Sequence, residues 1–292
     1  MKIAIIVFSG TGNTLYVSQL LANELQTLGA IVHRITLGVT QEEREETQRL
    51  TKNVAAYDLI GIAFPVLGFG APANVLDFVK SLPLAHTKVF LFKSAADNHQ
   101  VNNAASEALE SILALKGYDV FHDFLYMMPC NFMVSYPKVL NFQMIDTAKK
   151  KALFHARELM EGKRAKLHIS KLWHLIARWG HFLESQYGRV YFGMALHASS
   201  SCTLCLTCVK HCPAGNIKQE GQVLIFHNKC LFCMRCIYQC PSHAIEAKKY
   251  QWCIIKEGYT LASYLNTNEQ NRVFITQKSR GFWSHFRCYF DA

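Results

Sequence analysis

The sequence predicts two domains in tandem: a doubly wound α/β domain with a parallel five-stranded sheet, and a smaller cysteine-rich α+β domain. In the first half, apolar segments alternate with helical periods, and in the second half eight cysteines follow a regular spacing. A chain of 292 residues with 50% hydrophobic content can bury more than one core. Charge also separates the halves, because residues 1–145 hold 10 Lys and Arg against 12 Asp and Glu, whereas residues 146–292 hold 21 against 9.

Five apolar segments of the first half predict the strands of the sheet. Continuous apolar runs are typical of parallel strands buried on both faces. The helical periods between them end at Gly29 and Gly117, which suit helix C-caps. Ligands of such folds bind beyond the carboxyl ends of the strands. The expected strands are residues 3–8, 31–35 (the weakest), 59–64, 89–92 and 120–126.

The loop after the first strand has the composition of a phosphate site. Its glycines allow close backbone approach, its hydroxyls can donate hydrogen bonds, and a helix begins at its end. No Lys or Arg occurs between Lys2 and Arg34, and Leu15 stands where a dinucleotide fingerprint has its third glycine. We therefore expect a terminal phosphomonoester rather than a triphosphate or a dinucleotide; a structural glycine-rich turn is the alternative. The loop is Ser9, Gly10, Thr11, Gly12, Asn13 and Thr14.

This loop resembles the flavodoxin family, whose first loop has the form Ser/Thr-x-Thr-Gly-x-Thr and binds the phosphate of FMN. The resemblance implies an FMN-binding domain over residues 1–162, with two further loops beside the flavin ring. Neither loop has the Trp or Tyr that often stacks on the ring in flavodoxins, so the candidates for stacking are Phe69, His99, Phe132 and Tyr136. The implied ring contacts are Pro65, Val66, Leu67, Gly68, Phe69 and Gly70 in one loop, and Ser94, Ala95, Ala96 and Asp97 in the other.

No residue is assigned a catalytic role from the sequence. The segment 128–132, which contains Cys130, follows the fifth predicted strand and is expected within reach of the flavin edge. A single cysteine is more often a small buried apolar residue than a reactive thiol, and we expect the former.

The cysteine motif of the second half occurs twice, 28 residues apart, and has the form C-x2-C-x2-C-x3-C-P. Ile217 and Ile245 lie five residues beyond the last cysteine of each copy, so the duplication extends past the thiols. Cysteines in such a motif are candidate metal ligands. Structural zinc is one alternative, but zinc modules usually supply their ligands as two separated pairs. Rieske-type ligation requires histidines where this chain has cysteine.

The motif resembles that of bacterial two-cluster ferredoxins, in which the fourth cysteine of each copy ligates the other cluster. The resemblance implies two [4Fe–4S] clusters in a domain over residues 198–248. It assigns Cys202, Cys205, Cys208 and Cys240 to one cluster, and Cys230, Cys233, Cys236 and Cys212 to the other.

Residues 163–197 are expected to form a linker with a basic amphipathic helix. Its apolar stripe should pack across the domain junction, with a membrane surface or an acidic partner as the alternative. Residues 249–292 form an extension of unassigned role whose aromatics we interpret as packing. The stripe comprises Ile169, Leu172, Trp173, Ile176, Trp179 and Leu183.

In order and size the chain resembles the flavodoxin–ferredoxin fusions of anaerobic microbes. The resemblance implies an electron-transfer protein that relays electrons between FMN, two clusters and external redox partners. An FMN-dependent reductase of an organic substrate, fed through the clusters, is one alternative, and an iron–sulfur sensor or scaffold is another. An acidic ferredoxin or a reductase docking on the basic half is the expected partner; scattered cations without a reading motif argue against nucleic acid. Without a signal peptide or a long apolar run, a cytoplasmic location is expected.

Overall fold

The structure, a computed structural model, describes residues 1–265 and 273–290. Its first half contains a five-stranded sheet in the order β2-β1-β3-β4-β5. All four strand pairs are parallel. The order is the doubly wound order of flavodoxin-like folds, with the winding direction reversing between β1 and β3. The strands are β1 (Lys2–Val7), β2 (Ile31–Thr36), β3 (Leu59–Pro65), β4 (Lys88–Ala95) and β5 (Asp119–Met127).

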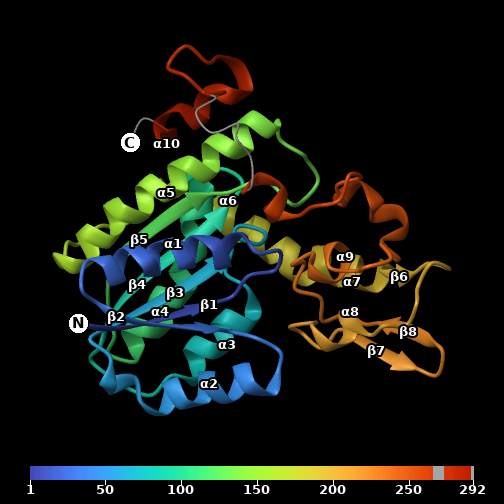
Figure 1. The fold of residues 1–292 in the computed structure, drawn as a ribbon, viewed down its shortest axis with the longest axis horizontal. Coiled ribbons are helices and arrows are strands. Elements are labelled where there is room, and N and C mark those ends of the chain that lie inside the picture. The colour runs from blue at the N-terminus through green and yellow to red at the C-terminus, as the bar shows by residue number, and fades with distance from the viewer. Residues whose placement is uncertain (266–272, 291–292) are drawn as a thin grey trace.

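Helices cover both faces of the sheet (Figure 1). Alternate residues of β1 serve the two layers: Ile3 and Ile5 pack under α1 and α5, whereas Ala4 and Ile6 pack on the opposite core. This alternation explains why every residue of the strand interior is apolar. The helices are α1 (Asn13–Thr27), α2 (Gln41–Lys52), α3 (Ala73–Ser81), α4 (Glu107–Leu115) and α5 (Lys138–Met160).

The sequence prediction of five strands is confirmed. Helix α5 begins at Lys138, directly after Pro137. Helices α2 and α3 were not predicted. The first of these is mostly charged and buries only Leu50; a capping box between Thr40 and Glu43 marks its start. Such a helix lacks the apolar periodicity on which the prediction depends.

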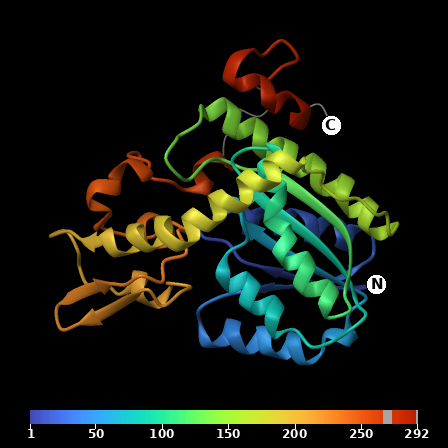
Figure 2. The same cartoon turned by 180° about the vertical axis from the view of Figure 1, so that it is seen from behind.

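A single helical segment connects the two halves across the back of the molecule (Figure 2). It consists of α6 (Lys171–Leu183), a π-helical turn (Glu184–Gly188) and α7 (Arg189–Ala195). The expectation that its apolar stripe packs across the junction is wrong for Leu172, Trp179 and Leu183, which are all more than half exposed. Of the stripe, Trp173 does pack on the first domain, against His99. The face that packs is the one with Ala177 and Gly180, because small residues let the helix approach the first domain closely.

The second half forms a small domain with a duplicated plan. Helices α8 (Thr207–Lys210) and α9 (Arg235–Tyr238) lie 28 residues apart, as the two cysteine motifs do. Two antiparallel pairs complete it, β6 (His197–Ala198) with β9 (Ile245–Glu246), and β7 (Ile217–Glu220) with β8 (Val223–Phe226). Ile217 and Ile245 begin equivalent strands and are both buried.

The chain returns to the first domain after the cysteine repeat. Ile255, Tyr259 and Leu261 join the core beneath α1 and α5. Further on, the hydroxyl of Tyr289 accepts a hydrogen bond from the backbone N–H of Met127 at 2.9 Å. The expected packing holds for Tyr259, Phe286 and Tyr289, which are buried, but not for Trp252 and Phe282, which are 60% and 62% exposed. The 3-10 turns are Lys248–Cys253, Leu261–Tyr264 and Gly281–Phe286, followed by α10 (Arg287–Phe290).

No helix among the described residues is long and apolar enough to cross a membrane.

Candidate functional site

The loop between β1 and α1 is the first part of the site. Gly12 adopts φ +102° immediately before the helix, a conformation that side chains other than glycine rarely adopt. The backbone N–H of Gly12 donates to the Ser9 hydroxyl at 3.1 Å. The loop therefore ends in a turn that presents hydroxyls and the first N–H groups of a 15-residue helix, the arrangement that suits an anion.

A cavity of about 410 Å³ lies at the carboxyl ends of the strands. Its size falls in the range of pockets that hold small cofactors. The predicted phosphate loop (9–14) and the two predicted ring loops (65–70 and 94–97) all contribute to its lining. The sequence prediction required these three segments, which are far apart in the chain, to meet in this way. From those loops it is lined by Ser9, Gly10, Thr11, Asn13, Thr14, Pro65, Val66, Leu67, Gly68, Phe69, Ser94, Ala95 and Ala96.

Three residues of the predicted set do not line this cavity. Gly12 supplies the turn described above. Gly70 lies against the ring of His181, where a β-carbon would clash. The Asp97 carboxylate faces outward and pairs with His285 Nε2 at 3.0 Å.

Hydrogen bonds hold the cavity loops to each other. Thr14 Oγ1 and Ser94 Oγ are 2.8 Å apart, which ties the phosphate loop to the end of β4. The Asn131 amide donates to Thr11 Oγ1 at 2.6 Å. The Asn13 amide donates to the Pro129 carbonyl at 2.9 Å, and its oxygen accepts from the Tyr259 hydroxyl. The C-terminal segment thus supports a residue of the phosphate loop.

The candidate stacking residues separate into two groups. Phe69 and Phe132 line the cavity. His99 instead packs edge-on to Trp173 at a centroid distance of 4.2 Å, and Tyr136 packs against Trp283 at 5.8 Å. Phe69 and Phe132 are therefore the candidates that a flavin ring in this cavity would meet.

Cys130 also lines the cavity, but its chemistry is that of a buried thiol. Burial raises the pKa of Cys130, and its Sγ donates to the Phe132 carbonyl at 3.0 Å. A thiol that stays protonated is a poor nucleophile, so the site gives no support to a catalytic Cys130.

The two cysteine loops share an unusual backbone. Leu204 and Leu206 flank Cys205 with φ of 53° and 61°, and Phe232 and Met234 flank Cys233 with 62° and 61°. Left-handed conformations cost non-glycine residues about 1–3 kcal/mol each and cluster at functional sites. Turns of this kind direct successive N–H groups inward and form anion-binding nests, which are frequent around iron–sulfur clusters.

The same repeat governs the last cysteine of each motif. The backbone N–H of Asn216 donates to the sulfur of Cys212 at 3.2 Å, and that of Ala244 donates to the sulfur of Cys240 at 3.3 Å. Both donors lie four residues after their cysteine. Hydrogen bonds to the ligating sulfurs are one of the features by which proteins tune iron–sulfur clusters.

The cysteines gather in two groups that draw on both motifs. Burial, followed by the neighbouring thiols of Cys240 and Cys202, raises the pKa of Cys208 to about 11. Burial, followed mainly by Cys233 and then also Cys212, raises the pKa of Cys230 to about 12.

Cys236 shows the same effect, because burial and the thiols of Cys230, Cys233 and Cys212 raise its pKa well above the usual range. Thiols that repel one another as anions fit a site whose charge is balanced by bound iron. The donor set is therefore suited to iron–sulfur clusters.

The cysteine loop of the second motif contacts the phosphate loop directly. A β-carbon on Gly10 would overlap the carbonyl oxygen of Cys233 and lie 3.0 Å from its Cβ. The Arg235 guanidinium donates to the backbone carbonyls of Ser9 and Gly10. Phe232 and Cys233 also line the cavity, so one of its walls belongs to the cysteine loop.

Sequence reasoning missed several lining residues. Gly180, Glu184 and Phe232 line the cavity from segments that the sequence did not place beside it. Burial raises the pKa of Glu184. Only Phe232 carried a signal, since it lies within the cysteine motif; its role depends on how the domains meet, which no local pattern reveals.

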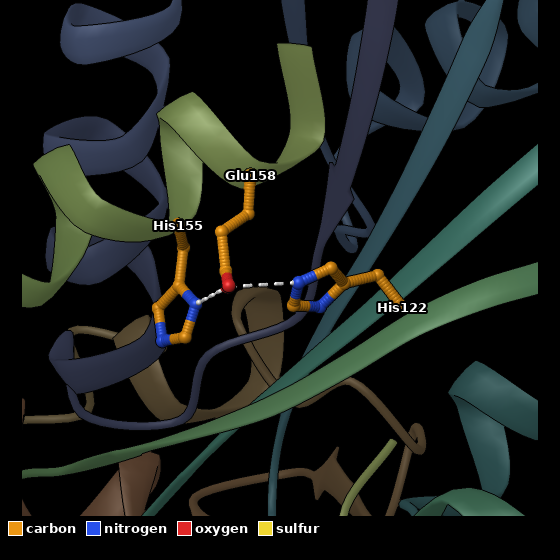
Figure 3. A group of neighbouring side chains, drawn as sticks. All are labelled: His122, His155 and Glu158. Atoms are coloured by element: carbon orange, nitrogen blue, oxygen red, sulfur yellow. Dashed lines mark hydrogen bonds and ion pairs between the residues drawn. The ribbon is translucent and has the colours of Figure 1, made fainter. Parts of the chain in front are cut away.

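A second polar cluster lies away from the cavity, between β5 and α5 (Figure 3). Glu158 Oε2 is 3.1 Å from His122 Nε2 and 3.4 Å from His155 Nδ1. The three ligand atoms lie within 4.8 Å of one another, as they would around a metal ion. Lys163, however, pairs with the other oxygen of Glu158 and supplies the positive charge. We therefore interpret the cluster as a tie between the last strand and the last helix of the first domain.

Comparison with known proteins gives matches to separate parts of the chain. Residues 194–283 match the family of 4Fe–4S dicluster domains. Solved structures align with just over half of the chain. The two-electron reduced flavodoxin of Megasphaera elsdenii shares 20% identity and a TM-score of 0.35, covering 53% of this chain and 98% of its own.

Two further structures cover 55% of this chain. An FMN-dependent NADH-azoreductase from Bacillus anthracis, solved with FMN, has 11% identity, a TM-score of 0.41 and 99% coverage of its own length. A Streptococcus pneumoniae flavodoxin has 16%, 0.37 and 97%. No curated protein matches the chain.

The strand order, the duplicated cysteine loops and the dicluster match define the class of protein. A flavodoxin-like α/β fold in the first half precedes a region, residues 194–283, that matches 4Fe–4S dicluster domains. In domain order the chain resembles a flavodoxin–ferredoxin fusion.

Proposed function

We propose that the chain is an electron relay between one FMN and two [4Fe–4S] clusters. FMN occupies the cavity at the strand ends, with its phosphate on Ser9–Thr14. The cluster held by Cys230, Cys233, Cys236 and Cys212 is proximal to the flavin. The cluster held by Cys202, Cys205, Cys208 and Cys240 is distal and exchanges electrons with an external partner.

The observation that carries this proposal is the shared wall of the cavity. Cys233, a proposed cluster ligand, lines the same cavity as the phosphate loop. The absence of a β-carbon at Gly10 and the two hydrogen bonds from Arg235 bring the loops into contact. With ligand and cavity in contact, electrons need no mobile domain to pass between the cofactors.

Bound FMN can hold one or two electrons whereas each cluster passes one, so the pair can couple a two-electron donor to one-electron acceptors. Aromatic side chains of the protein surround the space between the two cofactor sites. Phe232 packs edge-on to Phe132 at 4.7 Å and to Phe192 at 4.4 Å. These rings keep the space between the cofactor sites apolar and exclude water from it, which lowers the local dielectric constant around the proximal thiolates.

The distal cysteines lie where electrons would be exchanged with an external partner. Cys205 is exposed, in contrast to the buried Cys208 and Cys240. Hydrogen bonds from Thr207 lower the pKa of Cys205. Lys210 ends the adjacent helix α8, and with the excess of cations in this half it suits an acidic redox protein as partner.

Two matched variants test the order of the cofactors. The equivalent ligands Cys233 and Cys205 are each replaced by serine in anaerobically purified protein. The bound flavin is then reduced by a light pulse with a sacrificial donor, and flavin reoxidation and cluster bleaching are followed optically. The fast phase of flavin reoxidation should persist with a smaller amplitude in Cys205→Ser. In Cys233→Ser this fast phase should be lost. Equal loss in both variants would contradict the order.

A third variant keeps all eight ligands, in case a serine variant fails to assemble. Thr207 occupies the position of Arg235 in the first motif, so Arg235→Thr is a substitution that this loop geometry accepts. It removes the hydrogen bonds to Ser9 and Gly10 and should slow the fast phase at unchanged iron content. Arg49→Thr, on the exposed face of α2, is the control and should change nothing.

A further inference from the structure

An exposed apolar stripe runs the whole length of the helical segment that joins the domains. Its members recur every three or four residues from α6 through the π-turn into α7, so they share one face of a continuous helix. Each is between 40% and 64% exposed. Twenty-two helical steps correspond to about 33 Å. The stripe consists of Leu172, Leu175, Ile176, Trp179, Phe182, Leu183, Tyr187, Tyr191 and Met194.

The opposite face of the segment packs against the rest of the protein. His174 Nε2 lies 2.6 Å from Glu107 Oε2, and His181 Nδ1 lies 3.1 Å from the Gly68 carbonyl. A β-carbon on Gly180 would lie 2.7 Å from the ring of Phe69. In α7, one on Gly193 would lie 2.5 Å from Cys230 Cβ. These contacts fix the helix rotation, so the stripe cannot turn inward without breaking the junction.

The exposed charges of this helical segment are positive. Between residues 167 and 197 the charged side chains are Lys171, Arg178, Arg189 and a single carboxylate, Glu184. Lys171 and Arg178 are exposed. The Glu184 side chain is only 14% exposed and faces the cofactor cavity. A surface that meets the stripe therefore meets cations and large apolar side chains together.

We infer that this stripe binds the surface of an anionic lipid bilayer, with α6 and α7 lying parallel to the membrane plane. Trp, Phe and Leu beside Lys and Arg are the composition of interfacial helices. Trp179, Tyr187 and Tyr191 have the amphipathic rings that concentrate at the headgroup level.

A second copy of the chain suits the stripe less well. Pairing the same face of two copies would bring Lys171 and Arg178 of both chains into one interface without carboxylates between them. Like charges in a buried interface are costly. An anionic lipid surface instead contributes attraction of about 1 kcal/mol per cation near it, which corresponds to a factor of about five in affinity.

Membrane binding would hold both cofactor domains at one surface, because α6 packs on the first domain and α7 on the second. Phe192 is buried in the core around the cysteines, one residue from Tyr191 on the stripe. The domains could not separate without lifting one helix from the lipid. The inference stands apart from the relay, since binding needs neither electron transfer nor a partner protein.

Vesicle sedimentation with cofactor-loaded protein tests the inference. Vesicles of phosphatidylcholine alone are compared with vesicles containing phosphatidylglycerol. Binding should require the anionic lipid and weaken as salt is raised. Trp179→Gln/Leu183→Gln should weaken binding at least about tenfold, and Lys171→Gln/Arg178→Gln about thirtyfold. Iron and flavin contents are measured in every variant and should not change.

The matched control is Leu84→Gln/Leu115→Gln, which removes two apolar side chains that are 79% and 85% exposed on the first domain. It should bind vesicles as the parent protein does. The inference is overturned if the parent protein does not bind anionic vesicles. It is also overturned if the protein is a dimer by light scattering that the stripe variants alone make monomeric, because a second copy would then cover the stripe.

Discussion

The carbonyl oxygen of Cys233 occupies the space in which a β-carbon of residue 10 would lie. Because Gly10 has no side chain, the second cysteine loop can contact the phosphate loop. This contact joins the two halves at the point where their proposed cofactors meet. It also gives the first glycine of the phosphate loop a role that phosphate binding does not explain.

Gly10→Ala should separate the cofactor sites. The new methyl group meets backbone atoms, which cannot rotate away, so the cysteine loop must shift. We expect slower flavin-to-cluster transfer in the light-pulse experiment, because the two cofactor sites move apart. The control is Gly188→Ala, whose β-carbon would meet only ordinary contacts of 3.7 Å and longer. Unchanged transfer in Gly10→Ala would argue against direct contact.

Tyr259→Phe should weaken FMN binding although Tyr259 lies 246 residues from its partner Asn13. The variant leaves the buried Asn13 amide oxygen without its hydroxyl donor, at a cost of about 1–3 kcal/mol. Part of that cost should appear as a higher FMN dissociation constant, measured by fluorescence titration of flavin-free protein. Tyr118→Phe loses a comparable bond to the Pro83 carbonyl far from the cavity and serves as control. Equal affinities in both variants would contradict the role of the C-terminal segment.

The His155 cluster should make the first domain less stable as pH falls. Burial, and then the neighbouring His122, lower the pKa of His155 to about 3 in the folded protein. The unfolded side chain has a pKa near 6.5, so below about pH 6.5 the unfolded state binds more protons and stability declines down to about pH 3. Between pH 7.5 and 6.0 the loss is about 0.8 kcal/mol from this residue.

Urea unfolding of the parent protein and of His155→Phe at the two pH values measures this loss. Phenylalanine keeps the ring that stacks on Phe124 at 4.0 Å. The variant should show a smaller difference between the two pH values. An identical difference in both proteins would assign the pH dependence to other groups.

Lys93→Met should destabilise the sheet strongly. Lys93 Nζ lies 2.6 Å from Asp123 Oδ2 in a buried pair between β4 and β5. Removing the ammonium leaves a carboxyl group buried without its counter-ion, which costs about 3–5 kcal/mol. The double variant Lys93→Met/Asp123→Leu should recover part of the loss. Thermal unfolding compares the two, and a double variant less stable than the single one would contradict this account.

The sequence predicts what depends on local pattern. Both cysteine motifs and the first loop show their chemistry within about a dozen residues, and the buried strands are apolar on both faces. The orientation of α6 could not be predicted this way. Periodicity shows which residues share a face, but not whether that face turns inward; Ala177 and Gly180 decided the packing by their small size.

The contacts between domains were beyond the sequence for a related reason. Arg235 reaches Ser9 across 226 positions, and Tyr259 reaches Asn13 across 246. No spacing within either motif encodes such pairs. The left-handed residues beside Cys205 and Cys233 are similarly invisible, because leucine, methionine and phenylalanine give no sign of positive φ.

The central claim is that one polypeptide holds a flavin and two iron–sulfur clusters. Analysis of anaerobically purified protein for iron, acid-labile sulfide and flavin tests it most directly. The account predicts about eight irons, eight sulfides and one FMN per chain, from two cubane clusters and one cavity. A preparation that is colourless, or that holds tightly bound zinc in place of iron, would contradict it.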